Sequence, residues 1–166
     1  MDELFTAYSS DVFAFALRRS SPSMAEDVVS ETFLVAWRRL DSIPDTPKPW
    51  LLGVARRVLA NQRRSHGRQS AVQTRLGASD PDEWGRTDAE PSGDAAVLEA
   101  LAELAPADRD AITLIAWDGL TAEEAAIVLG CSRATFYVRL HRAKKRLADS
   151  LGIINQPIDA QEVDQP

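Results

Sequence analysis

The sequence of 166 residues contains very few of the side chains that enzymes and metal sites commonly use. It has one cysteine, Cys131, and two histidines. A single cysteine cannot form an internal disulfide, and two histidines are too few for most metal sites. No glycine-rich phosphate loop and no nucleophile motif is present. We therefore expect no catalytic residue, no metal and no cofactor, and a reducing, intracellular environment.

Long hydrophobic runs are also missing. No apolar run approaches the roughly 20 residues that a membrane-spanning helix needs. The N-terminal segment MDELFTAYSS starts acidic and lacks the pattern of a signal peptide. Hydrophobic residues nevertheless make up 45% of the chain, which is enough for a buried core. We expect a cytoplasmic protein of one compact domain or two small ones, without membrane insertion.

The formal net charge of −6 conceals an uneven distribution of charge along the chain. Lysine and arginine concentrate in residues 46–79 and 133–146, and neither stretch contains an acidic residue. Acidic residues cluster between these stretches, over residues 80–94. From charge alone, two solvated helical faces and two nucleic-acid-binding patches are equal alternatives.

Apolar residues at helical spacing predict three helices in the first half of the chain. The first covers residues 2–19, and an S-x-x-E capping box of Ser23 and Glu26 opens the second, over 24–40. Three prolines within 41–49 exclude a helix interior, and the third helix is expected over 49–65. Residues 67–93 lose the periodicity and predict a linker, in which Trp84 is expected to pack against a neighbouring domain.

The second half predicts four further helices. Two of them, near 94–104 and 106–117, precede a short helix that a T-x-x-E box of Thr121 and Glu124 caps. Gly130 ends that helix with a positive φ, and Ser132 caps the last helix, 133–148, before a polar tail. Because no strand-like alternation occurs, we expect an all-α protein of two small helical bundles joined by a flexible acidic linker.

The last two helices and the glycine turn between them predict a helix-turn-helix. Apolar residues spaced along the longer helix form one buried stripe, which consists of Phe136, Leu140, Ala143 and Leu147. Cys131 is expected to be a small core residue at the corner. The side chains outside the stripe are candidates for DNA contact. The predicted base contacts are Arg133, Ala134, Tyr137, Val138 and His141, and the predicted phosphate contacts are Arg139, Arg142, Lys144 and Lys145.

Three segments resemble the bacterial sigma factors of the extracytoplasmic-function class, group IV of the sigma-70 family. They are AEDVVSETFLVAWRRL, PKPWLLGVARRVLANQRRSHGR and LAELAPADRDAITLIAWDGLTAEEAAIVLGCSRATFYVRLHRAKKRL. The resemblance implies sigma region 2 over 1–66, a linker over 67–93, sigma region 4 over 94–151 and a tail over 152–166. It covers nearly the whole chain except the linker and tail.

The resemblance further implies a non-catalytic subunit that binds core RNA polymerase and directs it to promoters. The second helix matches the surface that holds the polymerase clamp, with Asp27 and Glu31 as expected contacts and Trp37 expected in the core. Region 4 is expected at the polymerase flap. Promoter DNA, both duplex and melted, is the second partner, and an anti-sigma factor is the third partner that the family implies.

By the same resemblance, the proline-rich loop 41–49 and the helix 49–65 bind the melted minus-10 strand, and region 4 binds the minus-35 element as duplex. An unstacked base needs a pocket beside cationic groups that hold the strand's phosphates. Trp50 either stacks on a base or belongs to the core, and the core is favoured. The expected minus-10 contacts are Lys48, Trp50, Arg56, Arg57, Asn61, Arg63 and Arg64.

Some positions depart from the family pattern. Arg57 stands where the family often has Asn, and Asn61 where it often has Asp. These departures leave the promoter sequence open. A helix-turn-helix regulator that acts without polymerase is the alternative function, although it leaves the first bundle unexplained. An enzyme and a helical protein-interaction module are more distant alternatives.

Overall fold

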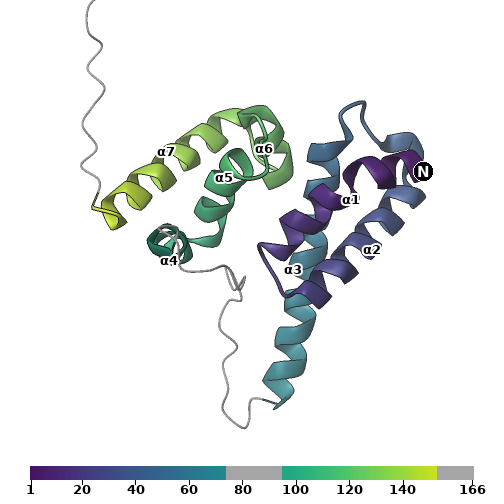
Figure 1. Cartoon of the computed structure of the whole chain (residues 1–166), viewed down its shortest axis with the longest axis horizontal. Helices are drawn as coiled ribbons and strands as arrows, with labels where there is room; N and C mark the ends of the chain where they lie inside the picture. Colours follow the sequence, from purple (N-terminus) through teal and green to yellow (C-terminus); the bar gives the residue numbers. More distant parts are fainter. Residues whose placement is uncertain (74–94, 153–166) are drawn as a thin grey trace, which may run out of the picture.

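A computed structural model describes the backbone of residues 1–73 and 95–152, and the side chains of these ranges except 66–73. Every regular element in the described ranges is helical, which confirms the predicted all-α class. Figure 1 shows the elements in two groups, α1–α3 and α4–α7. The helices are α1 Asp2–Leu17, α2 Pro22–Arg38, the 3-10 turn η1 Leu40–Ser42, α3 Pro47–Gln73, α4 Ala95–Glu103, α5 Pro106–Ala116, α6 Ala122–Leu129 and α7 Arg133–Ser150.

The first bundle is held together by one apolar face from each of its three helices. Val12 and Phe15 of α1 and Val28 of α2 are fully buried, and they pack in one core with Leu51 and Val58 of α3. These residues recur at helical spacing in the sequence, so the predicted stripes do form the core. None of the helices in the described part of the chain is sufficiently long and apolar to span a bilayer.

The second helix begins two residues earlier than the sequence predicted. Ser21 is the N-cap, and its hydroxyl accepts a hydrogen bond from the backbone N–H of Met24. The predicted capping box of Ser23 and Glu26 is therefore wrong. Pro22 explains the shift, because proline suits the first helical position, where its missing N–H costs nothing.

The third helix extends beyond both ends of its predicted range. It starts at Pro47, since prolines are tolerated within the first turn. It continues to Gln73, so residues 67–73 are helical where the sequence predicted linker. No proline interrupts this stretch, and Gly67 alone lowers helix stability by only about 1 kcal/mol. The rest of the predicted linker, with Trp84, and the tail from residue 153 lie outside the described residues.

The second bundle contains the predicted helix-turn-helix, with the predicted caps. The Thr121 hydroxyl accepts from the backbone N–H of Glu124, and the Glu124 carboxylate accepts from that of Thr121. Gly130 ends α6 with φ +65°, a conformation that residues with a Cβ rarely adopt. The Ser132 hydroxyl accepts from the N–H of Thr135 and so caps α7. These local bonds fix the angle at which α7 leaves the turn.

The predicted stripe of α7 faces the core. Phe136, Leu140 and Ala143 are buried, and Leu147 packs in a smaller apolar cluster with Leu101 and Leu104. Cys131 is half-buried against the main core, as predicted for a small apolar residue at the corner.

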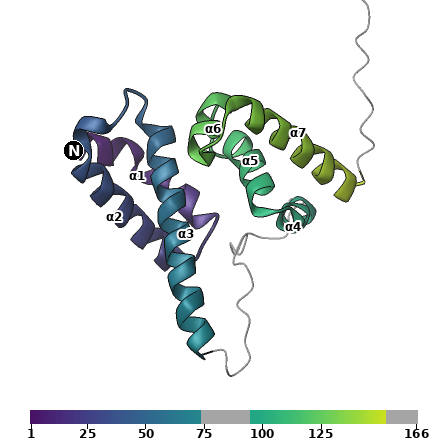
Figure 2. The same cartoon turned by 180° about the vertical axis from the view of Figure 1, so that it is seen from behind.

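The two bundles are packed against one another, a contact that the sequence did not predict. Figure 2 shows α6 beside α3, and buried residues of both bundles belong to one continuous core cluster. Gly53 of α3 lies at the contact, where a Cβ would be 3.8 Å from the Cα of Val128. A side chain larger than that of alanine at position 53 would therefore collide with α6.

Two neighbouring aromatic residues of α7 are expected to differ sharply in their contribution to stability. Replacing the fully buried Phe136 with alanine should lower the free energy of unfolding by about 3–5 kcal/mol, because the change leaves a cavity. The control Tyr137→Ala should change it by less than about 0.5 kcal/mol, since Tyr137 is exposed. Urea unfolding followed by circular dichroism measures both values, and similar losses would contradict the assignment of faces.

Candidate nucleic-acid interface

The outer face of α7 presents the predicted DNA-contacting residues to solvent. Eight of the nine are exposed, and Arg139 alone is half-buried. The exposed residues are Arg133, Ala134, Tyr137, Val138, His141, Arg142, Lys144 and Lys145.

Arg133, at the start of α7, is held by two weak contacts. Its guanidinium lies 2.7 Å from the Glu123 carboxylate of α6, and its Cζ atom lies 5.5 Å from the centre of the Tyr137 ring. The Arg133 and Glu123 side chains are 63% and 52% exposed, so water screens the ion pair and it contributes little stability. Arg133 can therefore exchange Glu123 for another hydrogen-bond acceptor at low cost.

A groove of about 390 Å³ runs along the basic side of α7. The Arg146 guanidinium donates to the carboxylate of Asp108 at the edge of the groove at 2.7 Å. Thr135 and Arg146 were absent from the predicted contacts. The sequence shows Arg146 within the basic stretch 133–146, but only the helix geometry places it beside Arg142. The lining residues are Asp108, Ala134, Thr135, Val138, Arg139, Arg142 and Arg146.

The predicted minus-10 residues from Arg57 onward in α3 are exposed. Arg57, Asn61, Arg63 and Arg64 all reach solvent. The Arg64 guanidinium donates to the Asn61 side-chain oxygen at 2.5 Å and to the Ala60 carbonyl at 3.2 Å. Arg63 donates to the backbone carbonyl of Arg19. The amide oxygen of Asn61 is thus engaged by its neighbour in this state.

The predicted minus-10 residues nearer the start of α3 are more enclosed. Lys48 lies 3.3 Å from the Asp11 carboxylate. Trp50 is half-buried against the core, which agrees with the favoured reading. Arg56 lies 3.1 Å from a carboxylate oxygen of Asp110 in the second bundle. The predicted minus-10 residues therefore fall into an exposed set and a more enclosed set, and Arg56 of the enclosed set faces the second bundle.

The exposed side of α2 carries both acidic and apolar residues. Asp27 and Glu31 are exposed, and Glu31 accepts a hydrogen bond from the Gln62 amide at 3.3 Å. Trp37 is 61% exposed, so its predicted place in the core is wrong. Thr32, Phe33 and Ala36 already fill the inward face of this part of α2, and Trp37 falls outside it. Leu34 is exposed on the same helix.

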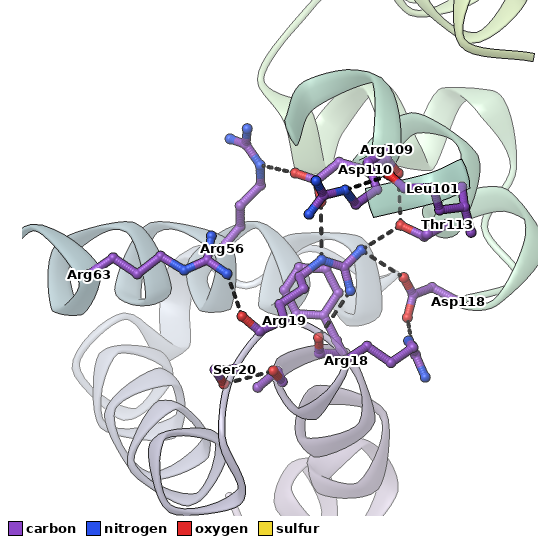
Figure 3. Close-up of polar contacts among 12 residues, drawn as sticks. Arg18, Arg19, Ser20, Arg56, Arg63, Leu101, Arg109, Asp110, Thr113 and Asp118 are labelled. Carbon is purple, nitrogen blue, oxygen red and sulfur yellow. Dashed lines mark hydrogen bonds and ion pairs between the residues drawn. The ribbon is translucent and has the colours of Figure 1, made fainter. Parts of the chain in front are cut away.

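Sequence reasoning missed a partly buried ionic cluster between the bundles. It is formed by Arg18 and Arg19 at the end of α1, by Arg56, and by Asp110 and Asp118 of the second bundle. Figure 3 shows these side chains converging from both bundles. The arginine pair was visible in the sequence, but nothing there identified its acceptors about a hundred residues away.

The described residues contain no group of three or more His, Cys, Asp or Glu side chains arranged to hold a metal ion. The exposed arginine and lysine side chains of α3 and α7 can form hydrogen bonds and ion pairs with an extended anionic partner.

Comparison with protein families agrees with this two-part arrangement. Residues 4–69 match the model of sigma-70 region 2, and residues 94–147 match that of sigma-70 region 4. The chain is 30% identical over 152 residues to the ECF RNA polymerase sigma factor SigL of Mycobacterium tuberculosis, covering 89% of this chain and 86% of SigL. The chain belongs to the extracytoplasmic-function (ECF) class of the sigma-70 family.

Further relatives of this sigma factor come from several bacteria. The ECF RNA polymerase sigma factor SigM of Bacillus subtilis is 30% identical over 153 residues, with 89% of this chain and 92% of SigM covered. Among solved structures, the sigma factor RpoE of Bartonella quintana, in complex with the anti-sigma factor NepR, is 30% identical. It aligns with a TM-score of 0.69 over 92% of this chain and 96% of RpoE. CnrH, solved with the cytosolic domain of CnrY, shares the fold at a TM-score of 0.59.

Proposed function

We propose that this sigma factor binds core RNA polymerase through α2, the minus-10 element through the loop 41–49 and α3, and the minus-35 element through α7. The observation that carries the proposal is the exposed face of α7. A capped helix-turn-helix presents a continuous row of base-reading and cationic side chains there, in a chain that also contains region 2.

The polymerase-binding surface of the proposal is the exposed side of α2. Asp27 and Glu31 supply negative charge, and Leu34 and Trp37 add exposed apolar area on the same helix. Exposed tryptophan is unusual on a free surface and is enriched at the centres of protein interfaces. The combination supports docking against a protein surface that is basic at its rim and apolar at its centre. The polymerase clamp is the expected partner here, and the flap is expected against region 4.

The two DNA surfaces differ in what they bind. On α7, Arg133 suits a guanine edge and Val138 suits a thymine methyl group, so this surface fits a duplex major groove. On α3, Arg57, Asn61 and Arg64 are exposed together and suit a strand whose bases are unstacked. Arg142 and the two lysines of α7 are placed for phosphate contact.

We further infer that the chain is not an enzyme and that it acts in the cytoplasm, where RNA polymerase works. Its partners include an anti-sigma factor, an inference supported by the relative RpoE, which was solved in complex with one. A helix-turn-helix regulator without polymerase is the competing function, and the exposed Trp37 on α2 argues against it.

The function is tested by run-off transcription with core polymerase. A library of random promoter fragments should yield transcripts with a defined start only when this protein is added. The selected fragments should share two elements, one for each DNA surface. Tight duplex binding without initiation would support the competing regulator instead.

Loss of the exposed tryptophan of α2 should weaken polymerase binding. Trp37→Ala is expected to cost about 2 kcal/mol, or roughly 30-fold in Kd, if Trp37 is central to the interface. The control Tyr137→Ala removes an exposed aromatic residue from the DNA face and should leave the affinity unchanged. Titration of labelled protein with core polymerase measures both, and equal affinities for the two variants would contradict the placement.

Arg133 and Arg142 should affect DNA binding differently. Arg133→Ala should abolish preference at one minus-35 base pair, worth about 1–3 kcal/mol, because a base contact is lost. Arg142→Ala should weaken binding to all DNA sequences alike, because a phosphate contact is lost. The slope of log K against log salt should decrease in magnitude by about 1. Holoenzyme binding to a base-substitution series of the selected minus-35 element measures both effects. The same preference profile for Arg133→Ala and the native chain would refute the assignment of Arg133.

A further inference from the structure

The ionic cluster between the bundles has all its cations on one side. Arg19 is 5% exposed, and its guanidinium lies 3.1 Å from Asp110 and 3.5 Å from Asp118. The same group donates to the Thr113 hydroxyl at 2.9 Å. Arg18 pairs with Asp118 as well. The first bundle therefore supplies the guanidinium groups, and the second bundle supplies the carboxylates (Figure 3).

Asp110 is shared between two helices of the first bundle. One carboxylate oxygen lies 3.1 Å from Arg19 Nε, and the other lies 3.1 Å from Arg56 Nε. Two carboxylates thus serve three guanidinium groups. Within the described residues, Arg18 Nε is buried without a hydrogen-bond partner. The cationic surface has more hydrogen-bonding capacity than its present acceptors use.

The second bundle covers this surface only while the two bundles are packed together. Along duplex DNA, at 3.4 Å per base pair, minus-10 and minus-35 elements lie about 85 Å apart. α7, with 18 residues, is about 27 Å long, and α6 beside it contacts α3 directly. A chain that binds both elements must therefore separate α3 from α6. Separation exposes Arg18, Arg19 and Arg56 on one face of the first bundle.

We propose that Arg18, Arg19 and Arg56 form a binding surface for the phosphate backbone of DNA, which Asp110 and Asp118 occupy in the closed form. Guanidinium groups bind carboxylates and phosphates with the same two-pronged geometry, so the acceptors are interchangeable. Arg56 belongs to the predicted minus-10 contacts, and the surface extends that site toward the end of α1. The proposal rests on the proposed function for its ligand, promoter DNA.

The exchange has a physical basis in the weakness of buried ion pairs. Burying Asp110 and Asp118 costs hydration energy that their pairing repays only in part. A DNA strand offers several phosphates at once, and it releases counterions when it binds arginines. The carboxylates become solvated when they are displaced. The closed pairing therefore lowers DNA affinity without blocking it permanently.

The first test neutralises the two carboxylates and measures DNA binding without polymerase. The variant is D110N/D118N, and the probe is fluorescein-labelled dT20, which reports phosphate contact independently of promoter sequence. The affinity of the variant for dT20 should rise at least tenfold. The slope of log K against log salt should steepen by about 2, because three arginines gain phosphate contacts that contribute about 0.7 each. The control E99Q/E103Q makes the same charge change on α4, away from the cluster.

The second test opens the bundles without changing charge. Gly53→Leu should separate α3 from α6 by collision, whereas Gly53→Ala should fit, because its Cβ meets Val128 at an ordinary 3.8 Å. Gly53→Leu should increase the radius of gyration in small-angle X-ray scattering and raise the dT20 affinity. Adding R18Q/R56Q to Gly53→Leu should remove the gain. Arg19 is left intact there, because it also bonds the Phe15 carbonyl within α1.

The outcomes separate this proposal from the proposed function. If neither D110N/D118N nor Gly53→Leu binds dT20 more tightly than its control, the proposal is wrong, whatever the radius of gyration. The proposal is also wrong if Gly53→Leu keeps its higher dT20 affinity after R18Q/R56Q is added. Run-off transcription by the native chain tests the proposed function separately, because the dT20 assay contains no polymerase.

Discussion

The Arg19 side chain connects the two bundles by bonding to acceptors in both. Within its own bundle it donates to the Phe15 carbonyl and lies over the Phe15 ring. Across the boundary it reaches Asp110, Thr113 and Asp118. A guanidinium with five donors in a fixed fork can meet these acceptors together, whereas a lysine cannot. The packing of α3 against α6 is compatible with this network because Gly53 leaves room at their contact.

The two proposed DNA surfaces differ in how open they are in this arrangement. The α7 face is open, and its Arg133 is held by an exposed ion pair and a contact with the Tyr137 ring. The start of the proposed minus-10 surface is partly occupied, since Arg56 is paired with Asp110. The chain therefore presents its proposed duplex-binding surface, while part of its proposed strand-binding surface faces its own carboxylates. The overall acidity of the protein acts in the same direction, because it opposes nonspecific DNA binding.

Local chemistry explains which parts of the fold were predictable. Thr121, Glu124, Gly130 and Ser132 act within a few residues of themselves, so the helix-turn-helix followed from the sequence. Ser23 and Trp37 were misplaced for a different reason. Ser21 and Pro22 offered a competing start for α2, and the width of the buried stripe on α2 depends on which helices pack against it. The helix α3 continues to Gln73, beyond its predicted end at 65, because the sequence over 66–73 contains no proline that would end it.

The sequence by itself determined the all-α class, the position of the helix-turn-helix and the division of α7 into a buried and an exposed face. Helical periodicity and capping depend on residues close together in the chain, so they can be predicted from the sequence alone. Only the tertiary structure decided which charges meet. Asp110 and Arg56 are 54 residues apart, and Arg18 and Asp118 are 100 apart. Such pairs depend on how two surfaces dock, as where Gly53 approaches Val128, and no local pattern determines that geometry.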